Sequence, residues 1–182
     1  MNDDTTLTQD DTAVLTAPLQ QRTDGTEMRF VEETFDGLDL DFVQFIKDKY
    51  IEPATTGSAG VDLRYIGPAP VQVGPGETFK VNTGLSVHLK NPQLVGLIAP
   101  RSGLGSKGLV LANLIGIIDS DYTGELIVNL WNRTSDTTFT LEPGERIAQY
   151  MVIPRFTFNP TLVDSFGETE RGAGGFGSSG RV

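Results

Sequence analysis

Short apolar segments recur every 8 to 12 residues between positions 57 and 158 of this chain. Turn-forming pairs and triplets such as Gly-Pro, Pro-Gly-Glu, Asn-Pro and Thr-Gly separate them. Segments of this length and spacing are typical of antiparallel strands, whereas βαβ units would place helical patterns between the strands. The pattern therefore predicts an all-β fold, a sandwich or a barrel.

Two stretches of this region share one local pattern. Residues 71–90 place a Pro-Gly pair between apolar runs, and residues 139–154 do the same. We expect each stretch to form a strand-turn-strand hairpin, because Pro and Gly fix the turn between two alternating segments. Their similarity also suggests a duplicated unit.

The first part of the chain has a different character. Residues 1–26 are rich in Thr, Asp and Gln and show little apolar periodicity, so we expect a disordered N-terminal arm. Residues 27–33 alternate weakly and predict a first strand. A short helix is expected over 38–50, with Asp39 or Asp41 as its cap. The apolar residues at helical spacing are Leu38, Phe42, Phe45 and Ile46.

Composition limits the function classes. The chain of 182 residues fits one domain, and its net charge of −10 argues against a nucleic-acid surface or an anionic membrane as partner. The absence of cysteine excludes disulfides and thiolate chemistry and fits a reducing cytoplasm. No apolar run approaches the roughly 20 residues of a membrane span. We therefore expect a cytoplasmic protein in which any phosphate site is a local cluster of arginines.

The segment GIIDSDYTGE, residues 116–125, is the first candidate for chemistry. If it is extended, Asp119 and Asp121 lie on one side, and Tyr122 lies on the other. One acid would then contact substrate while its neighbour braces the backbone. The alternative is an ordinary hairpin turn between strands at 109–118 and 125–132.

Three further segments carry polar groups near glycine or apolar residues. GSAGVDLR places small residues before Asp62, which suits close packing beside a polar site, although a buried turn would look alike. PRSGLG offers Arg101, Ser102 and backbone donors in a glycine-rich turn, the parts of an anion site, although a surface turn is equally plausible. RIAQ turns Arg146 and Ile147 to opposite faces of a strand and ends at Gln149, two residues beyond Ile147, although a sheet-edge pair is the alternative.

The tail RGAGGFGSSG satisfies the GxGxxG pattern through Gly172, Gly174 and Gly177. A dinucleotide site fails here, because such a run must follow a strand and open a helix, and only five residues remain after Gly177. A linker-like tail is one interpretation. The other is a flexible arm that closes over a nucleotide, with Arg for phosphate, Phe for the base and Ser hydroxyls as donors.

In this order the five segments resemble the five motifs of the trimeric dUTP diphosphatases (dUTPases), over about residues 54 to 181. The resemblance implies a jelly-roll-like β domain at 27–160, a glycine-rich C-terminal arm at 161–182, and a homotrimer whose active sites are shared between subunits. It also implies Mg²⁺-dependent hydrolysis of dUTP to dUMP and pyrophosphate. Such an activity keeps uracil out of DNA and supplies dUMP for dTTP synthesis.

The resemblance assigns roles by position. It implies that Asp119 activates the attacking water, that Tyr122 packs on the deoxyribose, and that Asp62 supports the metal through water. The segment from Asn113 to Gly116 corresponds to a uracil-reading hairpin. The remaining positions implied to bind substrate are Arg101, Ser102, Gly103 and Gln149 at the phosphates, and Arg171, Phe176, Gly177, Ser178 and Ser179 in the closing arm.

Two other functions stay open at this point. The related dCTP deaminases share the fold, but they require a glutamate base and lack both the Asp-Ser-Asp-Tyr arrangement and the glycine-rich arm. A trimeric nucleotide-binding module with a regulatory role is the second alternative. The residues 1–26 and 38–50 lie outside the core pattern, and the resemblance assigns them no role.

Overall fold

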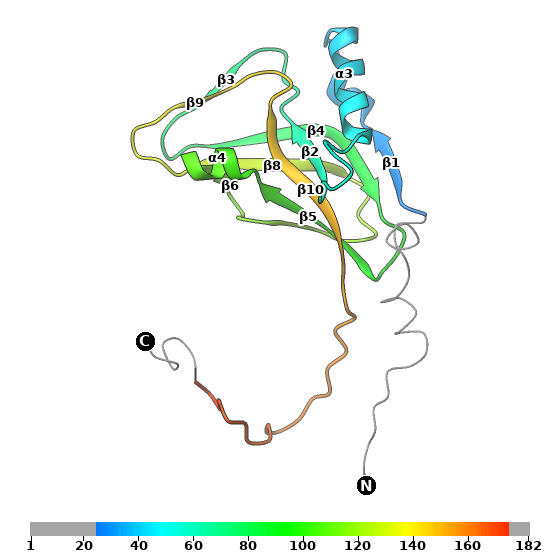
Figure 1. Ribbon diagram of the computed structural model, residues 1–182, viewed down its shortest axis with the longest axis vertical. Coiled ribbons are helices and arrows are strands. Elements are labelled where there is room, and N and C mark those ends of the chain that lie inside the picture. The colour runs from blue at the N-terminus through cyan, green and yellow to red at the C-terminus, as the bar shows by residue number, and fades with distance from the viewer. Residues whose placement is uncertain (1–24, 175–182) are drawn as a thin grey trace.

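The structure of the protein is a computed structural model, which describes residues 25–174 of the chain. Its body consists of two four-stranded antiparallel sheets and a two-stranded one, so the expected jelly-roll-like sandwich is confirmed (Figure 1). The first sheet has the order β1 (Glu27–Phe30), β4 (Thr78–His88), β8 (Glu125–Asn132) and β6 (Leu109–Leu111). The second has the order β2 (Val61–Arg64), β10 (Arg146–Pro154), β5 (Leu94–Pro100) and β7 (Gly116–Ile118), and β3 (Val71–Val73) pairs with β9 (Phe139–Leu141).

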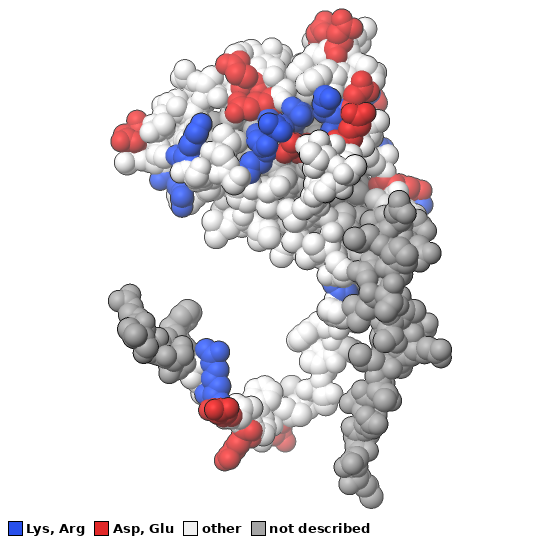
Figure 2. Space-filling model, in the orientation of Figure 1, with Lys and Arg blue, Asp and Glu red and all other residues white. Residues whose placement is uncertain are grey.

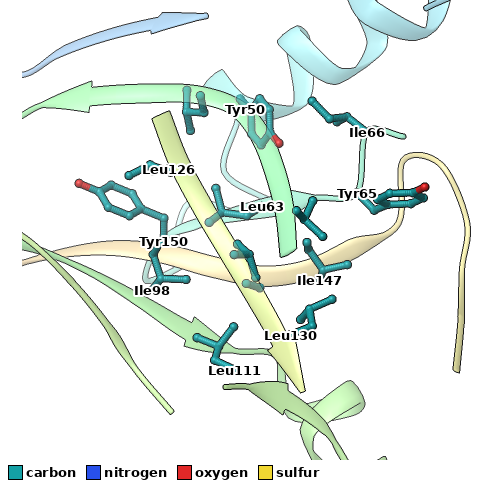
Figure 3. Close-up of a cluster of buried hydrophobic side chains, with 14 of the residues drawn as sticks. Tyr50, Leu63, Tyr65, Ile66, Ile98, Leu111, Leu126, Leu130, Ile147 and Tyr150 are labelled. Atoms are coloured by element: carbon teal, nitrogen blue, oxygen red, sulfur yellow. The ribbon is translucent and has the colours of Figure 1, made fainter. Parts of the chain in front are cut away.

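The core lies between the two larger sheets, and period-2 alternation along the strands builds it. On β8, Leu126, Val128 and Leu130 are buried, while Ile127 is 43% exposed on the opposite face. Leu126 and Leu130 lie in one cluster with Ile147 and Tyr150 of β10 and Ile98 of β5 (Figure 3). Each such side chain contributes roughly 1.5–3 kcal/mol on burial, so this cluster is the main source of stability.

The two Pro-Gly stretches form turns but not hairpins, which corrects that expectation. In each, a positive φ at Gly76 or Gly144 reverses the chain, and the carboxylate of the following Glu accepts a hydrogen bond from the backbone three residues earlier. The strands on either side of each turn then enter different sheets, since β3 pairs with β9 while β4 pairs with β1 and β8. Local turn chemistry fixes the reversal, and long-range packing decides the partner.

The expected strand over 109–118 is divided in two. A turn at 112–115, with Leu114 in a left-handed conformation (φ 63), separates β6 from β7. β6 pairs with β8, and β7 pairs with β5 in the other sheet. The hairpin between 109–118 and 125–132 is therefore absent.

The first described elements bind to the sandwich through aromatic side chains. The predicted strand stops at Phe30 and is followed by a 3-10 turn, η1 (Glu32–Phe35). The helix α3 (Leu40–Ile51) is confirmed, and the Asp39 side chain caps it by accepting from the Phe42 amide at 3.0 Å. Tyr50 is buried and donates to the Thr83 carbonyl at 2.8 Å. None of the helices within residues 25–174 has the length and apolar character needed to cross a membrane.

Candidate active site

One group of the predicted residues meets where β2, β10 and the end of β5 lie side by side. Gln149 of β10 stands opposite Asp62 of β2 on one side and Ala99 of β5 on the other. Arg101 follows directly after β5. Three segments that are far apart in the sequence therefore deliver a carboxylate, a guanidinium and a carboxamide to one place.

Asp62 holds two arginines in this group. Arg101 Nε donates to Asp62 Oδ1 at 2.8 Å, and Arg146 Nη1 donates to Asp62 Oδ2 at 3.3 Å. The Asp62 side chain is only 19% exposed, while Arg101 is 29% and Arg146 is 45% exposed. The carboxylate thus anchors both guanidinium groups while leaving them accessible, as an anion-binding cluster requires.

We call Asp62, Arg101, Arg146 and Gln149, which together form an anion-binding surface, the anion cluster. They border a cavity of about 480 Å³ that Ser102 and Gly103 also line. Gln149 Nε2 is fixed by donating to the Pro100 carbonyl at 3.1 Å. Gly60 on the other wall must be glycine, because a Cβ there would lie 2.1 Å from the Tyr150 carbonyl oxygen. The cavity is therefore lined by the cationic groups of Arg101 and Arg146, by the amide of Gln149, and by closely packed backbone at Gly60.

The expected turn at 100–105 is a short helix instead. α4 (Ser102–Lys107) begins after Arg101 and ends at Gly108, whose left-handed conformation (φ 112) returns its amide to the Leu104 and Gly105 carbonyls. The two glycines within the segment favoured a turn in the sequence analysis, but the capping by Gly108 outweighs them. Ser102 and Gly103 therefore line the cavity from a helical first turn.

Asp119 and Asp121 lie in a second place, beyond the end of β7. The Tyr122 amide donates to the Asp119 carbonyl at 3.1 Å, so the chain turns here, as the alternative interpretation predicted, and is not extended. Both acids line a cavity of about 370 Å³ together with Lys90 and Arg155. The turn is attached to the body where the Leu89 amide donates to the Ser120 carbonyl at 3.2 Å.

Tyr122 closes this turn against the start of β8. Its hydroxyl donates to the Glu125 carbonyl at 2.9 Å, and a Cβ at Gly124 would lie 2.4 Å from the same hydroxyl oxygen. The ring is 41% exposed, which leaves one surface for a ligand. Gly124 is thus required because the tyrosine ring covers it.

No role was predicted for Glu125, whose side chain anchors this turn. Its carboxylate accepts hydrogen bonds from the Gly84 amide at 2.6 Å, from Asn82 Nδ2 at 2.6 Å and from Thr34 Oγ1 at 2.9 Å. The carboxylate therefore ties β8 to β4 and to η1 next to Tyr122. Arg146 was noticed for its strand alternation, but its ion pair with Asp62 was not expected.

The turn between β6 and β7 presents Asn113 and ends at Gly116. Gly116 is buried against Ile98, and a Cβ there would lie 3.0 Å from the Ile98 Cβ. The neighbouring side chains point outward, with Leu114 at 68%, Ile115 at 44% and Ile117 at 67% exposed. The turn thus carries an amide side chain on an apolar, exposed surface.

The two groups lie at opposite ends of β5. Ile118 pairs with Gly96, so Asp119 lies near Val95, whereas Arg101 follows the other end of the strand. Six strand residues at 3.3–3.4 Å each separate the two positions by about 20 Å. Within one chain, the structure therefore does not bring Asp119 together with Arg101, Asp62 or Gln149.

The C-terminal segment leaves the sandwich after β10 (Figure 1). Phe156, Phe158 and Phe166 are 77%, 87% and 93% exposed. Arg171 Nε donates to the Gly174 carbonyl at 3.0 Å, a contact within the tail itself. The predicted residues Phe176, Gly177, Ser178 and Ser179 lie outside the described residues.

The donor set suits a metal held mostly by a ligand rather than by the protein. Residues 25–174 contain no group of three or more Asp, Glu and His side chains that converge on a point. Asp62 is the carboxylate in the cavity of the anion cluster, and its oxygens already accept from two arginines. This arrangement fits a hard cation contacted through water, with phosphate oxygens as the other ligands.

Comparison with known proteins adds the following. The chain matches the family described as dUTPase over residues 47–180. It is 56% identical over 129 residues to the deoxyuridine 5'-triphosphate nucleotidohydrolase of Aeromonas salmonicida, covering 70% of this chain and 84% of that protein. The dUTPase of Staphylococcus bacteriophage 80alpha, solved with dUPNHPP, superimposes with a TM-score of 0.67 at 26% identity, covering 87% of this chain and 99% of the other.

A second phage structure shares the fold. It is a variant of the dUTPase from phage phi11 of S. aureus, with a TM-score of 0.58 at 23% identity, covering 79% of this chain and 99% of the other. That structure is described as revealing how a structural Mg(II) ion is coordinated. At this level of identity, the likeness shows the fold alone.

Proposed function

This chain belongs to the dUTPase family and hydrolyses dUTP, and from that premise we propose how its residues share the reaction. The products are dUMP and pyrophosphate. The anion cluster around Asp62 holds the triphosphate, and the turn at Asp119 supplies the base. The function rests on the family match together with a cavity that two carboxylate-anchored arginines border.

The active site is shared between copies of the chain in a homotrimer. A base acts within hydrogen-bond reach of the water that it deprotonates, about 3 Å, or through one further water. The separation of about 20 Å between Asp119 and Arg101 along β5 is too large for both to act on one phosphorus. A ring in which the Asp119 turn of one subunit faces the anion cluster of the next removes this separation. The uncovered Leu114, Ile115 and Ile117 supply apolar surface for such a contact.

The chemical step is a displacement at the α-phosphorus. The Asp119 carboxylate accepts a proton from the attacking water, whose oxygen bonds to phosphorus while the bond to the β-phosphate oxygen breaks and pyrophosphate leaves. Arg101, Ser102, Gly103 and Gln149 position the phosphates and neutralise their charge. Positioning and charge neutralisation supply most of the catalysis in phosphoryl transfer, so few protein groups are needed.

Selection of the nucleotide depends on the other elements around Asp119. The exposed surface of the Tyr122 ring packs on the deoxyribose and leaves no room for a 2′-hydroxyl. Asn113 and the backbone up to Gly116 read the uracil by hydrogen bonds, so a cytosine would leave those groups unpaired. Unpaired buried polar groups exclude a wrong ligand more strongly than a missing apolar contact does.

Asp62 is the residue that would hold Mg²⁺, through water. When bound, the ion would neutralise negative charge on the phosphate oxygens. This role supplements the one that the geometry supports directly, which is to orient Arg101 and Arg146.

The C-terminal arm closes the site. Arg171 binds the terminal phosphate, Phe176 stacks on the uracil, and Gly177, Ser178 and Ser179 donate hydrogen bonds to the phosphates. The departure of the arm from its own sandwich supports its use at a neighbouring subunit (Figure 1).

The cytoplasmic location remains a prediction from composition.

Release of pyrophosphate from dUTP, dCTP, dTTP and UTP, with and without Mg²⁺, tests the proposal. We expect turnover of dUTP to exceed that of the other three at least about a hundredfold, because hydrogen-bond readout of the substrate gives such ratios. Chelation of Mg²⁺ is expected to abolish most of the turnover of dUTP. Ammonia release from dCTP would favour the deaminase alternative, and binding of dUTP without turnover would favour the regulatory module.

A further inference from the structure

A second basic cavity lies next to the cavity of the anion cluster. It has a volume of about 390 Å³ and shares Arg101, Gly103 and Arg146 with its neighbour. Arg64, Lys107 and Glu145 line this second cavity only. Since a water molecule occupies about 30 Å³ in the liquid, the space can hold a small oxyanion together with several waters.

Arg64 is built into the wall of this cavity. Its Nη1 donates to the Gly144 carbonyl at 2.7 Å, and its Nε is buried without an acceptor within the described residues. The ring of Phe45 from α3 lies under the guanidinium, with 5.6 Å between the Arg64 Cζ and the ring centroid. Phe45 precedes residue 47, where the family match begins.

The charges around the cavity are unbalanced. Four cations line it, Arg64, Arg101, Lys107 and Arg146, and Glu145 is the carboxylate of its lining. Asp62 of the neighbouring cavity pairs with Arg101 and Arg146, so Arg64 and Lys107 are the two cations that have no carboxylate partner within the described residues. Burial and repulsion by Arg146 and Arg101 lower the pKa of Arg64, against the attraction of Asp62. Four cations in one place stand out on a chain of net charge −10, and Figure 2 shows blue side chains gathered around α4, β2 and β10.

We propose that this cavity is a second oxyanion site, which binds a free phosphate or pyrophosphate ion beside the cleft for the substrate's triphosphate. Its ligand class follows from four cationic side chains that outnumber two carboxylates, Glu145 in the lining and Asp62 beside it. The position next to the anion cluster gives released pyrophosphate a place to bind before it leaves. The inference goes beyond the proposed function, because the site requires neither Asp119 nor a nucleotide.

The test uses the full chain with ¹⁵N-labelled arginine. The Nε–H of Arg64 is shielded from water, so its NMR signal is observable and reports on the cavity. Sodium phosphate and then pyrophosphate are titrated at constant ionic strength, without nucleotide and again with saturating dUPNHPP. We expect a saturable shift of the Arg64 signal under both conditions.

A substitution of Lys107 distinguishes binding in the second cavity from binding in the first, because this exposed side chain lines only the second. We expect Lys107→Gln to weaken phosphate binding about threefold to fivefold, as loss of one exposed charge contact does. Lys107→Arg should restore the affinity. Arg29→Gln removes one positive charge from exposed β1 and should change nothing.

Three results would overturn the site: no saturable shift with either anion, equal affinities for Lys107→Gln and Arg29→Gln, or loss of the response when dUPNHPP is bound. The last would place the anion in the triphosphate cleft. The titration without nucleotide stands whether or not the proposed function does, since that function is tested by turnover of dUTP.

Discussion

The anion cluster and the Asp119 turn differ in how firmly the protein holds them. In the cluster, Asp62 accepts from Arg101 and Arg146, and Gln149 is fixed to the Pro100 carbonyl. In the turn, the backbone is tied to Leu89, but within the described residues no group donates to the Asp119 carboxylate. The anion cluster is held together within a single chain, whereas the Asp119 carboxylate has no hydrogen-bond donor among residues 25–174.

This difference follows from the chemistry that each half performs. Charges aimed at phosphate oxygens are most effective when they are held in place before substrate binds. A base must instead meet a water that arrives with the substrate, so a fixed hydrogen-bond donor would compete for it. The open Asp119 carboxylate is therefore what a shared site requires of the subunit that supplies the base.

The largest effect is expected from removing the base. Asp119→Asn should fold and bind dUTP but lower kcat at least about a hundredfold, because loss of a general base costs that much. Single-turnover measurements with saturating enzyme separate this loss from weaker binding. Asp121→Asn makes the same charge change two residues away and should be at least about tenfold less affected. Near-normal turnover of Asp119→Asn would remove the residue from its role.

A smaller effect is expected from loosening the anion cluster. Asp62→Asn leaves Arg101 and Arg146 without their anchoring charge, so KM for dUTP should rise about tenfold, in keeping with hydrogen bonds between charged groups that are partly exposed. Initial rates across dUTP and Mg²⁺ concentrations give the two constants. Glu145→Gln, which removes a carboxylate from the same neighbourhood, serves as the control and should change KM less than about threefold. A fall in kcat with unchanged KM would contradict the positioning role.

The sequence predicted the parts of the site better than their arrangement. Local features were predicted correctly: the Asp39 cap, the helix that it begins and the two Pro-Gly turns all appear where they were expected. Strand partners were not, because β3 and β9 pair across 68 residues and a turn gives no information about such distant contacts. The helix α4 was missed since its stabilising residue, Gly108, lies beyond the segment that drew attention.

Separation of the site into two halves could not be foreseen from residue types. Asp119 and Arg101 are close in the sequence, yet β5 places them at opposite ends. The anchoring role of Glu125 could not be predicted either, because it depends on hydrogen bonds from Gly84, Asn82 and Thr34, which the fold brings together from distant positions. A partly buried carboxylate at the start of a strand is recognised only as a polar residue until its hydrogen-bond donors are known.

The comparison of the two halves leads to a test of whether they act across subunits. Asp119→Asn chains keep an intact anion cluster, and Arg101→Ala chains keep an intact base, so each variant alone should be inactive. If the base of one subunit serves the cluster of the next in a ring of three, every mixed ring contains one complete site. Random assembly makes about three-quarters of the rings mixed, so about a quarter of wild-type activity should return on co-expression.

The matched control places both substitutions in one chain and co-expresses it with wild type. A site within one chain would then leave about half of the activity, whereas a site shared by two chains leaves about a quarter, because both contributors must be wild type. A shared site therefore predicts about a quarter of wild-type activity in both experiments. A site within one chain predicts no activity when the two single variants are mixed and about half when the double variant is mixed with wild type. Native mass spectrometry establishes that mixed trimers form. Mixed trimers without returned activity would show that Asp119 and Arg101 of the same chain act together, despite the length of β5 between them.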